Sequence, residues 1–593
     1  MLHRFSRSSL CAYFYVFPES ENSEMVSDQD LMKTTLLSRL SAMAVISAST
    51  PSLIAAPGSL DAGFNTTGVV IKDFGASEAL CAVAVLSDGK IVAAGTTDVS
   101  GHDDILVVRY LPNGTLDPSF SVDGSEITNL LGTSNETATA MTIQPDGKIV
   151  VVGYTDATSG TSLNMFAIRF NANGGLDSSF GFSGKYTINP TLSADDRATG
   201  VRILPDGKIM IGGSARTNTS TTFALARLTA GGVLDNTFSG DGYQEVAAGY
   251  SECQAMAVQP DGKIILVGES KSGGNEDVVV ARCNSDGTLD NTFSTDGVVK
   301  TNIIGKDAAY ATTLQPDGKI VVVGHGNGGT DSVVVRYLTD GTLDTSFSLD
   351  GIYQESFGTF SSFSAVVLEA NGKILLGGAS GPLAGRNSTI VRLTTSGVLD
   401  EAFGGDGYEI KDLKPANGDF IFGMAVSPDG RLVAAGRAGN STGDIVLSRY
   451  NFFQKTDALV GPSASVLLGN NIYNKNGADQ AINLVLKQSD KKKVGYLRFQ
   501  NDGHEEDSFA IKGVKGNQFF GVKYFSGKNN VTAAVSAGTY KTTSVASGGS
   551  ASLKVEVVAR KKSKGKKRGL LVVATSQVDV NSVDAVLIKA KSN

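Results

Sequence analysis

Several residue types are scarce in this chain of 593 residues, and each scarcity excludes a class of protein. The sequence has no Trp, four Cys and four His. The cysteines show no paired framework, so a disulfide-stapled scaffold is not expected, and Cys81 and Cys253 are predicted to be small core residues. HExxH, GxSxG and a glycine-rich phosphate loop after a strand are also missing. The motifs therefore single out no catalytic, cofactor-binding or metal-ligating residue, and the binding residues are unknown.

Charge is sparse and unevenly distributed. Only 19% of the residues are charged, and the net charge is -7. From Lys455 to the end there are 22 basic and 10 acidic residues, a net of +12, which leaves 30 basic and 49 acidic residues, a net of -19, for the remainder. The contrast predicts an acidic body and a basic tail domain. The two are either separately evolved modules, or the tail attaches to an anionic envelope or polysaccharide surface.

Long hydrophobic runs are also missing, so no transmembrane segment is expected. The segment 32–56 resembles a secretory signal, with Lys33 and Arg39 before the apolar stretch Leu40–Ala48 and small residues near Ala56. Residues 1–31 form an acidic prefix that such a signal avoids. We therefore expect Met32 to be the natural start, residues 1–31 to be a misassigned extension, and the mature protein to be secreted or held at the cell surface.

One unit recurs seven times. It consists of Leu-Asp-x-x-Phe, a turn of the type Asp-Gly-Lys, and a valine-rich run that ends in Arg. The Leu-Asp pairs begin at Leu60, Leu116, Leu176, Leu234, Leu289, Leu343 and Leu399. The turns fall at Asp88, Asp146, Asp206, Asp261, Asp317, Asn371 and Asp429. The arginines are Arg109, Arg169, Arg227, Arg282, Arg336, Arg392 and Arg449. A repeat of this length indicates a solenoid, a propeller or an array.

Each unit has room for four short strands. In the third unit we expect strands over 198–204, 208–213, 223–228 and 242–246, with the first two joined by the Pro-Asp-Gly turn. Four antiparallel strands in each of seven units predict a seven-bladed β-propeller over residues 57–451. The first unit supplies only a last strand, over 68–74, and the seventh unit lacks one. The N-terminal strand is therefore expected to complete the seventh sheet, and small residues such as Ala84 place the strand before each turn nearest the axis.

The unit resembles the delta-60 repeat of large exported bacterial proteins. The likeness covers residues 60–450 and depends on Leu-Asp-x-x-Phe-x-x-Asp-Gly and Gln-Pro-Asp-Gly-Lys-Ile. It implies a propeller on an exported protein. It implies neither an enzyme activity nor a particular ligand.

The repeated polar residues have a structural and a functional interpretation. Each Arg lies eight residues before the next Leu-Asp carboxylate, and Arg449 would reach Asp61 in a closed ring. We expect one buried, bidentate Arg–Asp pair in each unit, whereas an anion-binding ring of arginines is the alternative. The motif phenylalanines are predicted to plug the core: Phe64, Phe120, Phe180, Phe238, Phe293, Phe347 and Phe403.

Other candidate sites are weaker. A second Asp-Gly follows the Phe in five units, at Asp123, Asp241, Asp296, Asp350 and Asp406. It is predicted to be a plain turn, because it lacks the dense ligand spacing of a calcium loop. His102 with Asp103 and Asp104 is expected at a solvated loop end. The loops between second and third strands vary and are candidates for binding: residues 96–103, 154–164, 214–222, 269–277, 325–331, 379–387 and 437–444.

The chain after the repeats differs in character. Residues 452–462 are predicted to be a linker, and 463–593 to form an immunoglobulin-like β-sandwich with strands over 480–487, 494–499, 508–512, 519–525, 531–535, 552–558, 569–575 and 584–590. The stretch Gly495 to Phe509 is similar to immunoglobulin-like modules at the C-termini of exported bacterial proteins. A basic run is expected to form a hairpin loop, with attachment to anionic polymers as its functional interpretation: Arg560, Lys561, Lys562, Lys564, Lys566, Lys567 and Arg568. Export argues against nucleic acid as its partner.

These features predict an exported, non-catalytic binding or scaffold protein with no cofactor, whose ligand is an unknown extracellular protein or polysaccharide. The propeller would present the recognition face, and the basic sandwich would anchor or space it. The alternative is an enzyme that acts on an extracellular polysaccharide, with carboxylates near the propeller axis as acid and base.

Overall fold

The computed structural model describes residues 58–593 except 76, 99–100, 131, 157–162, 190–194, 217–219, 271–275, 370, 383–384, 402, 415–417, 429, 440–442, 452–455, 464–465, 469–480, 488–489, 491, 502–506, 547–548 and 578–582. The predicted extension 1–31 and signal 32–56 lie outside the described residues. Across the described ranges, no helix has the length and apolar character needed to cross a membrane.

The repeats form seven four-stranded antiparallel sheets among the described residues. The strands, in sheet order, are β2 (Glu78–Val85), β3 (Ile91–Asp98), β4 (Asp103–Tyr110), β5 (Ser125–Thr128); β6 (Glu136–Ile143), β7 (Ile149–Thr155), β8 (Asn164–Phe170), β9 (Lys185–Ile188); β10 (Asp195–Ile203), β11 (Ile209–Arg216), β12 (Thr221–Leu228), β13 (Tyr243–Val246); β14 (Ser251–Val258), β15 (Ile264–Ser270), β16 (Val278–Cys283), β17 (Val298–Thr301); β18 (Ala308–Leu314), β19 (Ile320–Gly326), β20 (Asp331–Tyr337), β21 (Ile352–Glu355); β22 (Phe360–Leu368), β23 (Ile374–Gly381), β24 (Asn387–Leu393), β25 (Tyr408–Lys411); and β26 (Asp419–Val426), β27 (Leu432–Ala438), β28 (Asp444–Tyr450), β1 (Val69–Lys72). A short 3-10 turn, Asn327–Gly329, lies between β19 and β20.

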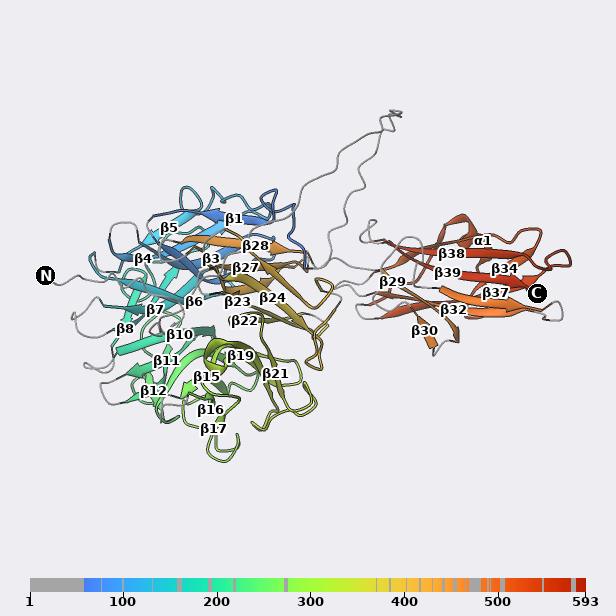
Figure 1. Ribbon diagram of the computed structural model, residues 1–593. Helices are drawn as coiled ribbons and strands as arrows, with labels where there is room; N and C mark the ends of the chain where they lie inside the picture. Colours follow the sequence, from blue (N-terminus) through green and yellow to red (C-terminus); the bar gives the residue numbers. More distant parts are fainter. Residues whose placement is uncertain are drawn as a thin grey trace, which may run out of the picture.

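The sheets are arranged in a ring (Figure 1). The first strand of each sheet packs against the first strand of the next, and β26 packs against β2, so the ring is closed. The chain seals it as expected: β1 pairs with β28, with Val70 opposite Leu447. The propeller predicted from the repeat is confirmed. The four strands expected in the third unit are also present, although β11 and β12 extend further than predicted.

The core lies between neighbouring sheets rather than at one centre. Each buried cluster combines side chains from two adjacent sheets, as Val152 and Ile211 do in the second and third. The seven motif phenylalanines are all 0% exposed, which confirms their role as core plugs. Cys81 and Cys253 are buried, also as expected.

The second strand of each of the seven sheets contains a glycine opposite a register shift in the first strand, a feature that was not predicted from the sequence. Each first strand has a register shift near its middle, such as the one between Ala198 and Gly200. Opposite the shift, a Cβ atom on Gly213 would overlap the backbone carbonyl of Arg197. The same overlap with the first strand recurs at Gly95, Gly153, Gly268, Gly324, Gly378 and Gly436.

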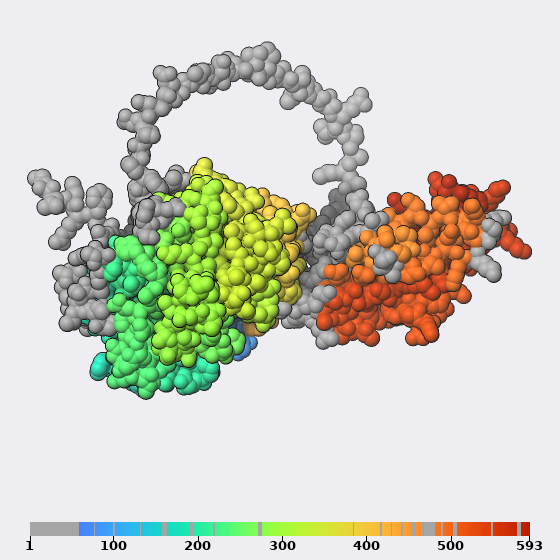
Figure 2. Space-filling model, turned by 90° about the horizontal axis from the view of Figure 1, so that it is seen from below, coloured from blue at the N-terminus to red at the C-terminus, as the bar shows by residue number. Residues whose placement is uncertain are grey.

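The C-terminal part is a second all-β body, drawn in orange and red in Figures 1 and 2. Its two sheets share one core, in which Phe499 and Ile588 are buried. The first sheet contains β30 (Val466–Leu468), β29 (Thr456–Ser463), β32 (Lys493–Asn501), β37 (Ser550–Ala559), β34 (Phe520–Ser526) and β35 (Asn529–Asn530), and the second contains β31 (Ala481–Leu486), β39 (Val583–Ser592), β38 (Lys567–Ser576), β33 (Phe509–Gly513) and β36 (Tyr540–Lys541). A sandwich of two sheets agrees with the prediction, while its likeness to immunoglobulin modules stays a prediction.

Three expectations for this part are wrong. Residues 456–462 are not a linker, because β29 pairs with β32 and buries Ala458 and Val460 in the sandwich core. The predicted strand over 531–535 is instead helix α1 (Thr532–Ala537), which Gly538 ends in a left-handed conformation, its N–H directed to carbonyls of the last turn. The basic run is not a hairpin loop, because β37 and β38, which it joins, belong to different sheets.

The glycine requirement can be tested in the third sheet. Gly213→Ala is expected to lower the free energy of unfolding by about 1–3 kcal/mol, because the backbone carbonyl of Arg197 cannot move aside within its sheet. Gly175→Ala is the control, since its Cβ would meet only the Asn173 side chain at 3.8 Å. Urea unfolding measures both variants. Equal stability of the two would show that the close approach does not matter.

Candidate functional site

The two ends of the ring differ, and the comparison locates the candidate sites. We call the end formed by the Asp-Gly-Lys turns and the loops between third and fourth strands the turn end. The opposite end, formed by the loops between second and third strands and the connections from sheet to sheet, is the loop end. The repeated charged residues lie at the turn end.

The repeated arginine contacts several partners at once, and Arg109 has four. The Arg109 Nε donates to the Asp117 carboxylate at 2.8 Å, and the guanidinium lies 4.8 Å from the centre of the Phe120 ring. Its Nη2 donates to the Ser119 hydroxyl at 2.9 Å, and its Nη1 donates to the carbonyl of Ala172 in the next sheet's unit. The arginine therefore fastens its own sheet to the next.

The same arrangement recurs around the ring. The Nε–carboxylate distances in the seven units are 2.6–2.8 Å, and the guanidinium-to-ring distances are 4.4–5.1 Å. Arg449 binds Asp61 across the closure and donates to the carbonyl of Pro112. One Arg–Asp pair in each unit is confirmed. The bidentate geometry expected for Arg109 is wrong, because a serine and a backbone carbonyl take its other two nitrogens.

A lysine from the turn completes each pair. Lys90 lies 3.0 Å from the Asp117 carboxylate, and the corresponding distances in the other units are 2.7–3.2 Å, with Arg431 as the cation in the seventh. Burial alone would raise the pKa of Asp117. Hydrogen bonds from Ser119 and Lys90, together with the charge of Arg109, outweigh burial and lower that pKa well below its usual range. These charges hold the fold together, so the turn end is a poor candidate for a ligand site.

The second Asp-Gly of the units forms a turn, as predicted. The Asp123 carboxylate accepts a hydrogen bond from the backbone N–H of Ser125 at 3.0 Å, and Asp241, Asp296, Asp350 and Asp406 accept the equivalent bond. His102 is half-buried beside Asp103, whose pKa is raised to about 6 by burial and by the neighbouring carboxylates of Asp98, Asp104 and Asp156.

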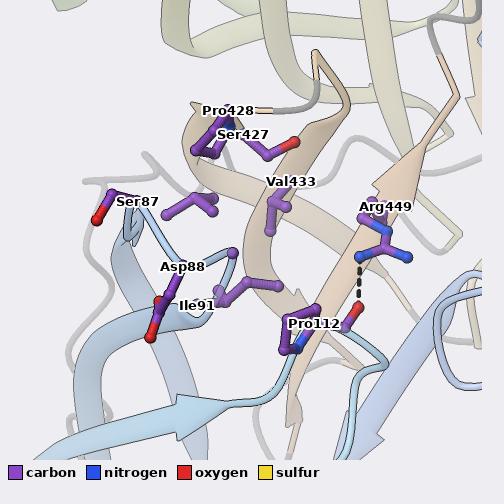
Figure 3. A pocket seen from close by; sticks show the side chains of 10 residues that line it. Ser87, Asp88, Ile91, Pro112, Ser427, Pro428, Val433 and Arg449 are labelled. Atoms are coloured by element: carbon purple, nitrogen blue, oxygen red, sulfur yellow. Dashed lines mark hydrogen bonds between the residues drawn. The ribbon is translucent and has the colours of Figure 1, made fainter. Parts of the chain in front are cut away.

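A pocket of about 280 Å³ opens at the turn end between the seventh and first sheets (Figure 3). In the second unit, the Gln144 side chain reaches to within 3.4 Å of Arg169. The seventh unit has Ser427 at that position, and its short side chain bonds to the carbonyl of Arg431 instead. The pocket follows from this substitution. Arg449 on its wall is already bound to Asp61, so the pocket offers little unused polarity.

A set of buried acids at the loop end was not predicted. They lie in or directly before the first strands, two residues before the register shift, and are Glu78, Glu136, Asp196, Asp307 and Asp419. The other two sheets have Ser251 and Ser361 at this position, and all seven residues are at most 2% exposed. Most of these acids accept backbone N–H groups from the segment that enters their sheet, as Asp307 does from Ile303 at 2.7 Å. Their regular spacing from the turns is the signal that could have revealed them.

One of these acids belongs to a group of three close carboxylates in the described part of the chain. At the closure of the ring, Asp73, Glu78 and Asp444 each place a carboxylate oxygen within 4.8 Å of the others. Burial, followed by the charges of Asp73 and Asp444, raises the pKa of Glu78 to about 7. No local motif predicts this cluster, because Asp444 comes close to Asp73 and Glu78 only when the ring closes.

A second group at the loop end combines arginine with phenylalanine. The Arg386 guanidinium lies 3.9 Å from the Phe360 ring centre and 5.5 Å from that of Phe420, and Arg437 lies 5.2 Å from Phe420. We call these four residues the Arg–Phe cluster. Burial, with a smaller effect from the charge of Arg437, lowers the pKa of Arg386.

Among the described residues, this combination of two arginines and two phenylalanines occurs in the sixth and seventh sheets, whereas the second and third sheets have an Arg–Tyr contact, Arg197 to Tyr154 at 5.1 Å. In the first strands of the other six sheets, the position of Phe420 is occupied by Ala79, Thr137, Arg197, Glu252, Ala308 and Ser362. The position of Arg437, in the paired second strands, is occupied in the same order by Thr96, Tyr154, Ser214, Glu269, His325 and Ala379. The loop end thus breaks the symmetry that the turn end keeps.

The basic run of the sandwich is well exposed. Six of its seven basic side chains are exposed, and only Arg568 is half-buried, where it donates to the carbonyl of Lys515 at 2.7 Å. Ser563 in the middle of the run is 0% exposed and bonds to the Ser592 hydroxyl at 3.0 Å. The loop is therefore pinned at its centre while its cations face the solvent.

The repeats match a known family. Residues 86–120, 144–180, 204–238, 259–293, 315–347 and 369–403 match the family model described as domain of unknown function (DUF5122) beta-propeller. Each segment runs from the end of a first strand, through the turn, to the motif phenylalanine. No curated protein has a significantly similar sequence.

Solved structures are similar only at a distance. The extracellular domain of the one-component system BT4673 from B. thetaiotaomicron is 10% identical, with 87% of this chain and 57% of that chain covered and a TM-score of 0.33. The polysaccharide lyase Uly1 is 11% identical (65% and 91% covered, TM-score 0.35), and Sqt1 from Chaetomium thermophilum is 10% identical (67% and 98%, TM-score 0.35). This chain thus spans under two thirds of the first structure, and none of these likenesses bears on function.

The junction arginines can be tested by a substitution that keeps the charge. Arg336→Lys is expected to cost about 2 kcal/mol of unfolding free energy, because lysine cannot lie flat on Phe347 while also reaching Asp344 and the carbonyl of Thr395. Arg216→Lys, at an exposed arginine, is the control. Urea denaturation compares the two, and a neutral result for Arg336→Lys would contradict the role of the junction.

The same junctions predict how stability depends on pH. The pKa of Asp344 is lowered to about 2, since hydrogen bonds from Ser346 and Lys319 and the charge of Arg336 outweigh the effect of burial. A carboxyl whose pKa is lower in the folded state stabilises the fold above about pH 4 and loses that contribution as the pH falls toward its folded pKa. The urea midpoint should therefore drop between about pH 4 and pH 2. Asp344→Asn should be less stable at pH 7 but show a smaller drop.

Proposed function

We propose that this protein is an exported, non-catalytic binding protein that acts at or outside the cell surface. The propeller is its recognition module, and the loop end is the recognition face. The basic sandwich anchors or spaces the propeller. Support comes from the division between the two ends of the ring: the turn end uses its repeated charges to join sheets, whereas the loop end varies from sheet to sheet.

The Arg–Phe cluster is the observation that carries this proposal. Two guanidinium groups near one another attract a ligand with negative charge, and arginine recognises carboxylate or sulfate groups through its fork of N–H donors. The half-buried Phe360 ring provides apolar surface against which a sugar ring packs, whereas Phe420 is buried. The ligand class that fits best is a polysaccharide that carries carboxylate or sulfate groups.

The basic run suits the anchoring role. Its exposed cations stand on a loop that Ser563 holds in place. A patch of one sign attracts a surface of the opposite sign, and salt weakens that attraction. The anionic surface of a cell envelope is such a partner.

The binding proposal is tested with the full chain and a panel of acidic and neutral polysaccharides. We expect tighter binding to the acidic members. The double variant Arg386→Gln, Arg437→Gln should weaken that binding by at least about tenfold, which corresponds to the loss of about 1.4 kcal/mol. Lys523→Gln, at an exposed position in β34 of the sandwich, is the control. Isothermal titration calorimetry measures each variant.

The anchoring role of the basic run is tested by neutralising its exposed lysines at 561, 562, 564, 566 and 567. This change should remove salt-sensitive binding to anionic vesicles and leave polysaccharide binding intact. Unchanged polysaccharide affinity in the double arginine variant would refute the loop end as the recognition face.

An enzyme that acts on an extracellular polysaccharide is the second candidate function, and one observation favours it. The Asp73, Glu78 and Asp444 cluster occurs at a single position in the ring, and the raised pKa of Glu78 suits a general acid. If the protein cleaves an acidic polysaccharide, release of reducing ends should be detectable and should disappear in Glu78→Gln. Binding without product favours the first proposal.

A further inference from the structure

The carboxylate cluster at the ring closure gathers groups from three segments of the chain. Asp73 follows β1, Glu78 begins β2, and Asp444 begins β28. Asp73 is exposed, Asp444 is half-buried, and Glu78 is only 2% exposed. One oxygen from each lies within 4.8 Å of the other two, a spacing at which a single cation can contact all three.

Glu78 is incompletely satisfied. Its Oε1 accepts the backbone N–H of Phe74 at 2.8 Å. Its Oε2 is buried and has no hydrogen-bond partner within the described part of the chain. A buried carboxylate oxygen without a partner destabilises the fold unless a cation or donor reaches it.

The equivalent acids of other sheets differ in this respect. Asp419 in the seventh sheet also has a buried oxygen, Oδ1, without a partner in the described part of the chain, whereas Glu136 in the second sheet is fully satisfied. Glu136 also begins a first strand and is 0% exposed. Its Oε1 accepts hydrogen bonds from the Ser134 and Thr155 hydroxyls, and its Oε2 accepts the backbone N–H of Leu130 at 3.3 Å. The closure therefore differs from its neighbour in leaving one buried oxygen open toward two further carboxylates.

The charge at the closure is only partly balanced. The Lys414 ammonium lies 2.6 Å from the Asp444 carboxylate, and the backbone N–H of Gly75 donates to Asp73 at 2.9 Å. Within the described part of the chain, the ion pair with Lys414 offsets the charge of one of the three carboxylates, so the cluster keeps an excess of negative charge. A divalent cation supplies the missing charge, whereas a hydrogen-bond donor alone would not.

We propose that Asp73, Glu78 and Asp444 form a calcium-binding site at the closure of the propeller. Ligands that are all oxygen, with carboxylates predominating, favour calcium over the transition metals, and calcium tolerates the irregular geometry that three separate segments produce. The ion ties the segment after β1 to both the first and the seventh sheets. This site is independent of the polysaccharide proposed for the loop end.

The test is calcium titration of the metal-free full chain by calorimetry and thermal unfolding. We expect one calcium ion to bind per chain and the melting temperature to rise with calcium concentration, because an ion that binds only the folded chain stabilises it. Glu78→Gln should weaken calcium binding by at least about tenfold and remove the thermal shift.

Glu136→Gln is the matched control, since it changes the same residue type at the same position of the next sheet. It should alter stability without changing the response to calcium. Asp73→Asn serves as a second variant, because this residue is exposed and its replacement spares the core. No calcium-dependent heat or thermal shift in the wild type would overturn the proposal, as would an undiminished response in both Glu78→Gln and Asp73→Asn. A response to magnesium but not to calcium would overturn the choice of ion.

Discussion

The ring depends on a guanidinium group that lies flat on a phenyl ring while its N–H groups bind a carboxylate and the neighbouring sheet. A buried ion pair contributes to stability only if its remaining donors and acceptors are satisfied. This condition explains why the whole motif recurs as a unit. The Asp neutralises the arginine and the Phe supports its face. At Arg109, the Ser119 hydroxyl and a backbone carbonyl across the junction accept hydrogen bonds from the other nitrogens. Two of the seven units lack that hydroxyl, because Gly63 and Ala402 stand two residues after the Asp. Loss of the Asp leaves a charge buried without compensation.

The repeat made the propeller and its closure predictable, because the motif spacing locates strands and turns and the first unit is visibly incomplete. The strand glycines and buried acids were harder to find. Gly213 is needed because of a register shift in the opposing strand, which has no mark in the local sequence. The cluster of Asp73, Glu78 and Asp444 depends on contacts between chain segments far apart in sequence. In the C-terminal part, residues 452–462 were predicted to be a linker, although Gly461 permits close approach of β30 to β29.

The division between the two ends of the ring separates stability from recognition. At the turn end, a substitution in the motif affects two sheets at once, so the units must remain alike. At the loop end, no two sheets have the same pair of side chains at the positions of Phe420 and Arg437. Most of the buried acids accept backbone N–H groups of the connecting segments, as Asp307 does from Ile303. Such a scaffold allows seven loops to change independently while the strands that carry them stay fixed.

The pairing of β1 with β28 also has a consequence for the order of folding. Asp61 and Arg449, which meet beside this pairing, are separated by 388 residues, so nearly the whole ring must be synthesised before the last sheet can be completed. Contacts of such long range form slowly, since the chain loses much entropy before it gains them. Until then β1 has no partner strand, and β28, once made, presents an unpaired edge to strands from other molecules until β1 reaches it. The joint that completes the ring is thus also the point at which a growing chain is most exposed to domain swapping and aggregation.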